Sequence, residues 1–119
     1  MNPAEQKPII GFTAGDLNGI GLEVTIKALN DTRITDLCIP VVFASNKSIN
    51  FYKKLLPEGN FSYQSIKDFE RLSPKTVNVF SSWEDEVNIQ PGQLTNEAGA
   101  YAVKSLNDAV QALKDGHIH

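Results

Sequence analysis

The chain has little cysteine, little histidine and no long apolar run, and each shortage excludes a class of protein. Its 119 residues contain a single cysteine, Cys38, so an internal disulfide is excluded. No apolar run approaches the ~20 residues that a membrane-spanning helix needs. Residues 1–8, MNPAEQKP, lack the basic and apolar regions of a signal peptide. We therefore expect a cytoplasmic protein with no membrane partner, in which Cys38 is a buried residue.

Charge and histidine content narrow the chemistry further. The chain carries 11 basic and 14 acidic residues, a net charge of −3, which argues against the basic surface of a nucleic-acid-binding domain. The two histidines, His117 and His119, stand at the end of the chain. A serine or cysteine nucleophile elsewhere has no nearby histidine base, so hydrolases are disfavoured. The acidic run at 84–86 indicates a solvated loop rather than a metal site.

Apolar periodicity divides the chain into alternating strands and helices. Hydrophobic residues make up 41% of the chain and charged residues 21%, as in an ordinary globular domain, and we treat residues 1–119 as one α/β segment. Short β-branched runs predict strands, and 3.6-residue spacing predicts helices. The predicted strands are 7–13, 37–44, 61–64 and 76–80, the last two hairpin-like, and the predicted helices are 21–30, 47–56 and 96–114.

The apolar faces of two predicted helices bear on packing. In the first helix, Val24, Ala28 and Leu29 share a face that we expect to be buried. The last helix carries a continuous apolar stripe, formed by Ala98, Tyr101, Ala102, Leu106, Ala109, Val110 and Leu113. Gly116 is expected to end this helix, and residues 117–119 resemble the start of a strand that would cover the stripe. The segment is therefore expected to be an incomplete N-terminal part of a longer protein.

The most informative stretch is 8–23, PIIGFTAGDLNGIGLE, which predicts a buried strand, a glycine-rich turn and the start of a helix. Such a turn lies at the carboxyl end of a strand and beside a helix N-terminus, where open α/β sheets bind ligands. The spacing of Gly15, Gly19 and Gly21 is not that of a dinucleotide fingerprint, and no Gly-Lys pair completes a P-loop. Two interpretations stay open: a ligand-binding loop, or a turn that uses its glycines only for geometry.

The residues of this loop resemble the N-terminus of the 4-hydroxythreonine-4-phosphate dehydrogenases, enzymes of pyridoxal phosphate biosynthesis. Their usual G-D-P-A-G-I-G-P-E is GDLNGIGLE at 15–23 here, with departures at Leu17, Asn18 and Leu22. The related isopropylmalate and isocitrate dehydrogenases carry a similar loop. A second stretch, PGQLTNEAGAY at 91–101, is similar to the helix-opening segment of the 4-hydroxythreonine-4-phosphate dehydrogenases and favours that family.

The resemblance implies the N-terminal part of an isocitrate/isopropylmalate dehydrogenase-like fold and a parent enzyme that is a cytoplasmic homodimer. Such a parent would oxidise the phosphorylated substrate 4-phosphooxy-threonine with NAD and decarboxylation, using a divalent metal held by three histidines from two subunits. Those histidines lie beyond this segment, and His117 and His119 do not match them. We therefore expect no catalytic residue, metal ligand, bound cofactor or activity in the segment alone. Alternatives are a stand-alone small α/β ligand-binding or interaction domain and an isopropylmalate dehydrogenase-like fragment.

Within the segment, the glycine loop would form one wall of the cofactor or substrate cleft. The residues expected to contact the cofactor are Asp16, Asn18, Gly19, Ile20 and Gly21, and Thr13 is the candidate for contact with the substrate phosphate. The glycines would let a flat ligand lie close to the backbone. Asp16 would accept hydrogen bonds either from a ligand or from the backbone of its own turn.

Overall fold

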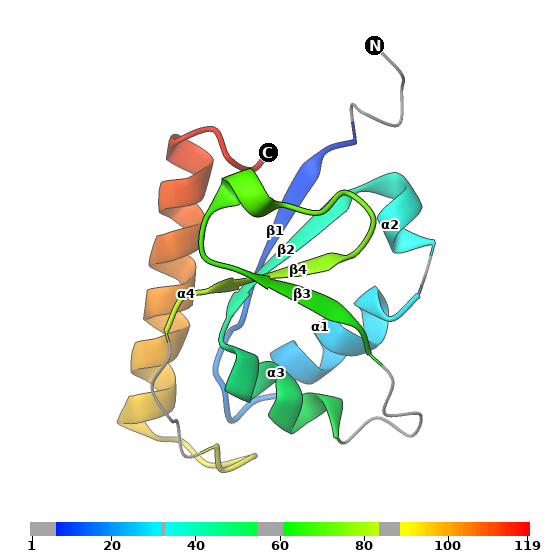
Figure 1. Ribbon diagram of the computed structural model, residues 1–119. Helices are drawn as coiled ribbons and strands as arrows, with labels where there is room; N and C mark the ends of the chain where they lie inside the picture. Colours follow the sequence, from blue (N-terminus) through cyan, green and yellow to red (C-terminus); the bar gives the residue numbers. More distant parts are fainter. Residues whose placement is uncertain (1–6, 32, 55–60, 84–88) are drawn as a thin grey trace.

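The computed structural model describes residues 7–31, 33–54, 61–83 and 89–119 and shows an α/β fold built on a parallel sheet (Figure 1). The strands lie in the order β1-β2-β4-β3, and each neighbouring pair is parallel. Their bounds are β1 (Ile9–Thr13), β2 (Ile39–Ala44), β3 (Tyr63–Ile66) and β4 (Val77–Ser81). Parallel strands need crossover connections, which return the chain along the faces of the sheet. The predicted fold class is confirmed.

Helices cover both faces of this sheet (Figure 1). They are α1 (Gly21–Leu29), α2 (Ile34–Leu37), α3 (Asn46–Lys53), η2 (Phe69–Arg71) and α4 (Asn96–Lys114). The alternation of side chains along β2 separates the two layers, since Val42 and Ala44 pack in one cluster with α1 and α3. Val41 and Phe43 point to the other face and pack against α4. No helix in the described part of the chain is long and apolar enough to cross a membrane.

The connection between β3 and β4 differs from the hairpin-like arrangement that the sequence predicts. The two strands are parallel, with Tyr63 opposite Val77, so that prediction is wrong. The chain returns through residues 67–76, which contain η2. Asp68 stabilises the start of η2 because its carboxylate accepts a hydrogen bond from the Glu70 amide at 2.9 Å. A capped 3₁₀ turn thus replaces the tight turn that a hairpin requires.

Several predicted bounds shift in the structure. The predicted strand at 37–44 begins only at Ile39, because the preceding residues form α2 instead. The helix predicted at 47–56 is α3, which begins after Ser45; the Ser45 hydroxyl accepts a hydrogen bond from the Ser48 amide in a reciprocal capping box. The end of that prediction, and the acidic loop predicted at 84–86, lie outside the described residues.

The helix α1 buries a face other than the predicted one. Leu22, Ile26 and Leu29 are buried, whereas Val24 is 55% exposed and Ala28 is also exposed. The buried residues follow the i, i+4, i+7 spacing of a helical face, counted from the second residue of the helix. The sequence prediction was wrong because it did not count Leu22 as the first residue of the buried face.

The helix α4 has the predicted bounds but packs through small residues. Its buried positions are Ala98, Ser105, Ala109 and Ala112, whereas the larger Leu106, Val110 and Leu113 of the predicted stripe are exposed. Ser105 fixes this orientation, because its hydroxyl donates to the Phe43 carbonyl at 2.6 Å and accepts from the Ala14 amide at 2.9 Å. Gly116 follows the helix with a φ of 79°, as predicted.

The residues after α4 lie beside the free edge of β1. The His119 amide donates to the Ile9 carbonyl at 2.8 Å, and the Ile9 amide donates to His119 Nδ1 at 2.9 Å. Ile118 is buried and belongs to the same cluster as Val41 and Phe43 of β2. Its place depends on Gly11, since a Cβ atom there would lie 2.7 Å from Ile118 Cδ1. No strand is assigned to 117–119, but these residues already pair with β1.

Candidate ligand-binding loop

The glycine loop, residues 14–20, connects the carboxyl end of β1 to the N-terminus of α1. Because the sheet is parallel, the residues that follow β2 and β4 reach the same edge of the sheet. The candidate site residues therefore lie where open α/β sheets bind ligands. Thr13 is the exposed last residue of β1, and it pairs with Phe43 of β2 immediately before the loop begins.

Asp16 folds the loop back on itself. Its Oδ1 accepts a hydrogen bond from the Asn18 amide at 2.8 Å, and its carbonyl accepts one from the Gly19 amide at 2.9 Å. The preceding Gly15 has a φ of 66°, a conformation that side chains other than glycine adopt with strain. Asp16 is half-buried, and its second carboxylate oxygen makes no hydrogen bond within the described residues. One oxygen therefore builds the turn, while the other has no partner among these residues.

Asn18 joins the glycine loop to the loop that precedes α4. It is 3% exposed, and its side-chain oxygen accepts from the Gln90 amide at 2.7 Å. Its side-chain nitrogen donates to the Gln93 carbonyl at 3.0 Å and to Thr95 Oγ1 at 3.1 Å. The Gly92 amide donates to the Asn18 carbonyl at 2.7 Å. Asn18 thus positions two loops, and a direct contact between Asn18 and a cofactor stays a prediction.

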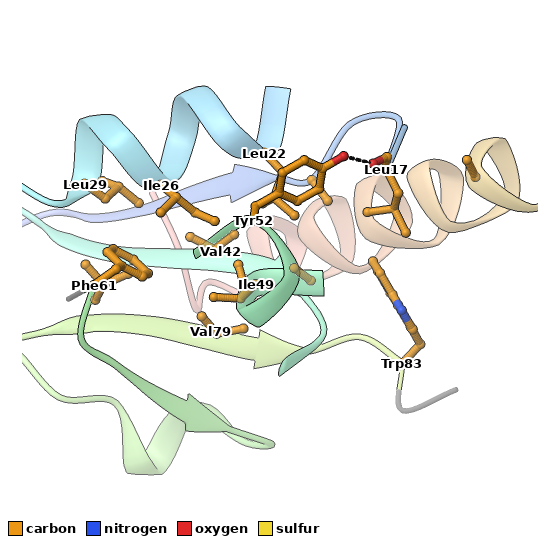
Figure 2. Packing of buried hydrophobic residues seen from close by; sticks show 14 residues of the cluster. Leu17, Leu22, Ile26, Leu29, Val42, Ile49, Tyr52, Phe61, Val79 and Trp83 are labelled. Carbon is orange, nitrogen blue, oxygen red and sulfur yellow. Dashed lines mark hydrogen bonds between the residues drawn. The ribbon is translucent and has the colours of Figure 1, made fainter. Parts of the chain in front are cut away.

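Tyr52 holds the loop from the side of α3. Its hydroxyl donates to the Leu17 carbonyl, and the Gly19 carbonyl lies 3.4 Å from it (Figure 2). Tyr52 is 2% exposed and Leu17 is fully buried, in a cluster that also contains Trp83. Burial, with a further contribution from the charges of Glu23 and Asp16, raises the pKa of Tyr52. The phenol therefore keeps its proton and remains a donor at neutral pH.

The N-terminus of α1 has no side-chain cap. Ile20 is the residue before the helix; it is 74% exposed and its side chain makes no capping hydrogen bond. Gly21 is exposed as the first helical residue. An uncapped helix N-terminus presents free N–H groups and the positive end of the helix dipole. Glu23 lies in this first turn as predicted and pairs with Lys27 at 3.5 Å, so it forms an ion pair within the helix.

The structure also brings residues to this edge that sequence reasoning missed. Ser82 Oγ and Trp83 Nε1, directly after β4, are buried and make no hydrogen bond within the described ranges. Tyr52 and Thr95 were missed as well, since each contacts the loop across a long sequence separation. Gln90 and Gln93, in the loop that precedes α4, also contact the glycine loop, through hydrogen bonds of their backbone groups with the Asn18 side chain. No periodicity signals such contacts, although Thr95 occupies a helix N-cap, a position that threonine favours.

The two histidines lie away from this loop. His117 stacks on Phe69 with ring centroids 4.6 Å apart, and His119 pairs with Ile9 at the opposite end of β1. Among the described residues, no group of three or more His, Cys, Asp and Glu side chains could hold a metal ion. Cys38 is half-buried, and burial raises the pKa of its thiol, with Lys7 opposing that shift.

Comparison with known proteins identifies what this arrangement resembles. The chain is 34% identical over 115 residues to a 4-hydroxythreonine-4-phosphate dehydrogenase of Bacteroides thetaiotaomicron, covering 96% of this chain and 31% of that protein. A Clostridium botulinum protein with the provisional name D-threonate 4-phosphate dehydrogenase is 26% identical over 125 residues, covering 94% of this chain and 34% of that protein. No protein-family model matches the chain.

The fold gives the same result. A 4-hydroxythreonine-4-phosphate dehydrogenase from Burkholderia phymatum, solved by crystallography, superposes with a TM-score of 0.79 and 28% identity, over 94% of this chain and 34% of that one. The chain thus spans about a third of the length of the relatives it matches. The resemblance predicted from the glycine loop and the 91–101 stretch is confirmed. This chain is a relative of the 4-hydroxythreonine-4-phosphate dehydrogenases and has the N-terminal part of their fold.

Proposed function

We propose that this chain supplies the N-terminal segment of an NAD-dependent dehydrogenase. The parent enzyme, a cytoplasmic homodimer, would oxidise 4-phosphooxy-threonine and release carbon dioxide in pyridoxal phosphate biosynthesis. The observation that carries the proposal is the match to a 4-hydroxythreonine-4-phosphate dehydrogenase along 96% of the chain. The glycine loop supports it, because its position at the carboxyl edge of a parallel sheet is where such folds bind ligands.

The residues of the loop fit an anionic, hydroxyl-bearing cofactor such as NAD. The uncapped N-terminus of α1 would attract a phosphate of the cofactor, and the exposed Ile20 would pack against an apolar ring. The free oxygen of Asp16 would accept a hydrogen bond from a ribose hydroxyl. Thr13, exposed at the end of β1, would donate its hydroxyl to the substrate phosphate. The chemistry that NAD would supply is acceptance of the hydride. The residues of this segment would bind and orient the cofactor.

A divalent metal fits this segment less well. The described residues contain no cluster of metal-binding side chains, and both histidines are engaged far from the loop. If the parent uses a metal, we propose that its ligands come from residues outside 1–119 and that the segment alone is inactive. The contribution of this segment would be the wall that positions the cofactor and excludes water from one side of the cleft.

A chimera provides the test. In the Bacteroides thetaiotaomicron relative, the aligned N-terminal region is replaced by this chain, and NADH formation is measured with 4-phosphooxy-threonine and with D-threonate 4-phosphate. The substitution Asp16→Ala should lower turnover far more than thermal stability. The matched control Asp36→Ala, at an exposed position of α2, should change neither. If Asp16→Ala keeps full activity and only lowers the melting temperature, Asp16 has a structural role alone.

A further inference from the structure

Tyr52 contacts the glycine loop from inside the protein, where it is shielded from any ligand. The residue lies in α3, whose start is fixed by the Ser45 capping box, and its side chain is 2% exposed. The ring packs edge-on against Phe51, with centroids 5.1 Å apart, and belongs to the same cluster as Leu17 and Leu22. A ring enclosed in this way on a helix is held in one position. Its hydroxyl is therefore a fixed point against which the loop is set.

The Tyr52 hydroxyl contacts two backbone carbonyls of the glycine loop. It donates a hydrogen bond to the Leu17 carbonyl and lies 3.4 Å from the Gly19 carbonyl (Figure 2). Both carbonyls therefore point toward α3. The peptide bonds of the described residues are all trans, and in a trans peptide the N–H points away from the C=O. The amides of Asn18 and Ile20, which belong to the same two peptide groups, therefore point to the opposite side of the loop.

The side of the loop opposite Tyr52 carries the groups that a ligand would meet. The Asn18 amide donates to Asp16 Oδ1 at 2.8 Å, which places the Asp16 carboxylate on that side. Ile20 is the uncapped residue before α1, and its amide makes no hydrogen bond within the described residues. An acceptor from Asp16 and a donor from Ile20 thus face outward together. Their directions follow from the two peptide groups that the Tyr52 hydroxyl holds.

We propose that Tyr52 is a positioning residue for cofactor binding, because its hydroxyl fixes the glycine loop in the conformation that NAD meets. The inference rests on the proposed function, in which this loop forms one wall of the NAD site. Tyr52 touches neither cofactor nor substrate and acts through the peptide groups of Leu17 and Gly19. Without the hydroxyl, the loop populates other conformations. The apparent affinity for NAD then falls in proportion to the fraction of the enzyme whose loop is correctly set.

The first measurement is the steady-state kinetics of the chimera described above and of two variants in α3. Tyr52→Phe removes only the hydroxyl. Ile49→Val is the matched control, because Ile49 is fully buried in the same cluster and has no polar group with which to hold the loop. Tyr52→Phe should raise the KM for NAD about three- to tenfold, and should change kcat and the KM for 4-phosphooxy-threonine less than about twofold. Ile49→Val lowers thermal stability but should leave all three constants unchanged.

Amide hydrogen exchange in the 119-residue chain gives a second readout that needs no cofactor. The Asn18 and Gly19 amides both bond to Asp16 within the loop, so their exchange rates report how often the loop opens. The rates are divided by those of the β2 amides, which corrects for a general loss of stability. In Tyr52→Phe, the corrected rates of the two loop amides should be at least about threefold higher than in Ile49→Val.

The outcomes separate this inference from the proposed function. Faster loop exchange together with a raised KM for NAD supports the role of Tyr52. An active chimera in which Tyr52→Phe leaves the KM for NAD or the loop exchange unchanged overturns that role, while the proposed function stands. A raised KM for 4-phosphooxy-threonine alone places the substrate at the loop and overturns the role toward NAD. A chimera that forms no NADH even with Tyr52 in place refutes the proposed function, and this inference with it.

Discussion

Replacement of Asn18 by alanine tests whether the two loops at the carboxyl edge are held together as described. The substitution removes the hydrogen bonds of the side chain to the Gln90 amide, the Gln93 carbonyl and Thr95 Oγ1, at 2.7, 3.0 and 3.1 Å. The bond between the Gly92 amide and the Asn18 carbonyl involves only backbone and can persist. At a net value of about 1 kcal/mol for each hydrogen bond, we expect a loss of roughly 2–3 kcal/mol in the free energy of unfolding.

The assay is urea denaturation of the 119-residue chain, with Asn107→Ala as the control. Asn107 is exposed on α4, where alanine is the better helix former, so the control should be neutral or slightly stabilising. Asn18→Asp should be at least as damaging as Asn18→Ala: it keeps the acceptor for the Gln90 amide, but it buries a carboxylate whose second oxygen faces the Gln93 carbonyl with no donor between them. A loss below about 0.5 kcal/mol for Asn18→Ala is typical of a surface substitution and would refute the role of Asn18 in joining the two loops.

Three further results are expected. Tyr52→Phe should lower the free energy of unfolding by about 1–3 kcal/mol in urea denaturation, because the buried Leu17 carbonyl loses its donor; an unchanged midpoint would contradict this. The Cys38 thiol, whose pKa burial raises, should react with a disulfide reagent at pH 8 more slowly than free cysteine does; an equal rate would show an accessible, unperturbed thiol. The hydrogen bond from the Arg33 side chain lowers the pKa of Asp31 to about 2. The stabilisation by this pair is therefore present above the ordinary carboxyl pKa and is lost as the pH falls toward 2. Arg33→Ala should raise the Asp31 pKa in a carboxyl NMR titration, and no rise would count against the pair.

Local patterns predicted the parts of the fold that depend on neighbours in sequence. Gly116 ends α4 because a positive φ favours glycine, and the run of β-branched residues in β2 marks a strand buried on both faces. The glycine loop was found for the same reason, since Gly15 and the residues after it determine their own turn. Each of these features is encoded within about ten residues of sequence.

Contacts across the chain could not be predicted in this way. Nothing in the sequence near Asn18 indicates a bond to Thr95, and nothing near Tyr52 indicates one to Leu17. The predicted orientation of α4 was wrong because hydrophobicity alone favours burial of Leu106 over burial of Ser105. In the structure, the Ser105 hydroxyl forms hydrogen bonds with β2 and with the glycine loop, and these bonds turn the side of α4 with small residues toward the sheet. The parallel pairing of β3 and β4 depends likewise on tertiary structure.

We propose above that this segment functions as the N-terminal part of a dehydrogenase. The most direct measurement is the turnover of the chimera with NAD, set beside that of the intact Bacteroides thetaiotaomicron relative. We predict that the chimera forms NADH from 4-phosphooxy-threonine, while residues 1–119 alone form none. A chimera that is folded and dimeric but forms no NADH from 4-phosphooxy-threonine or D-threonate 4-phosphate would contradict the claim.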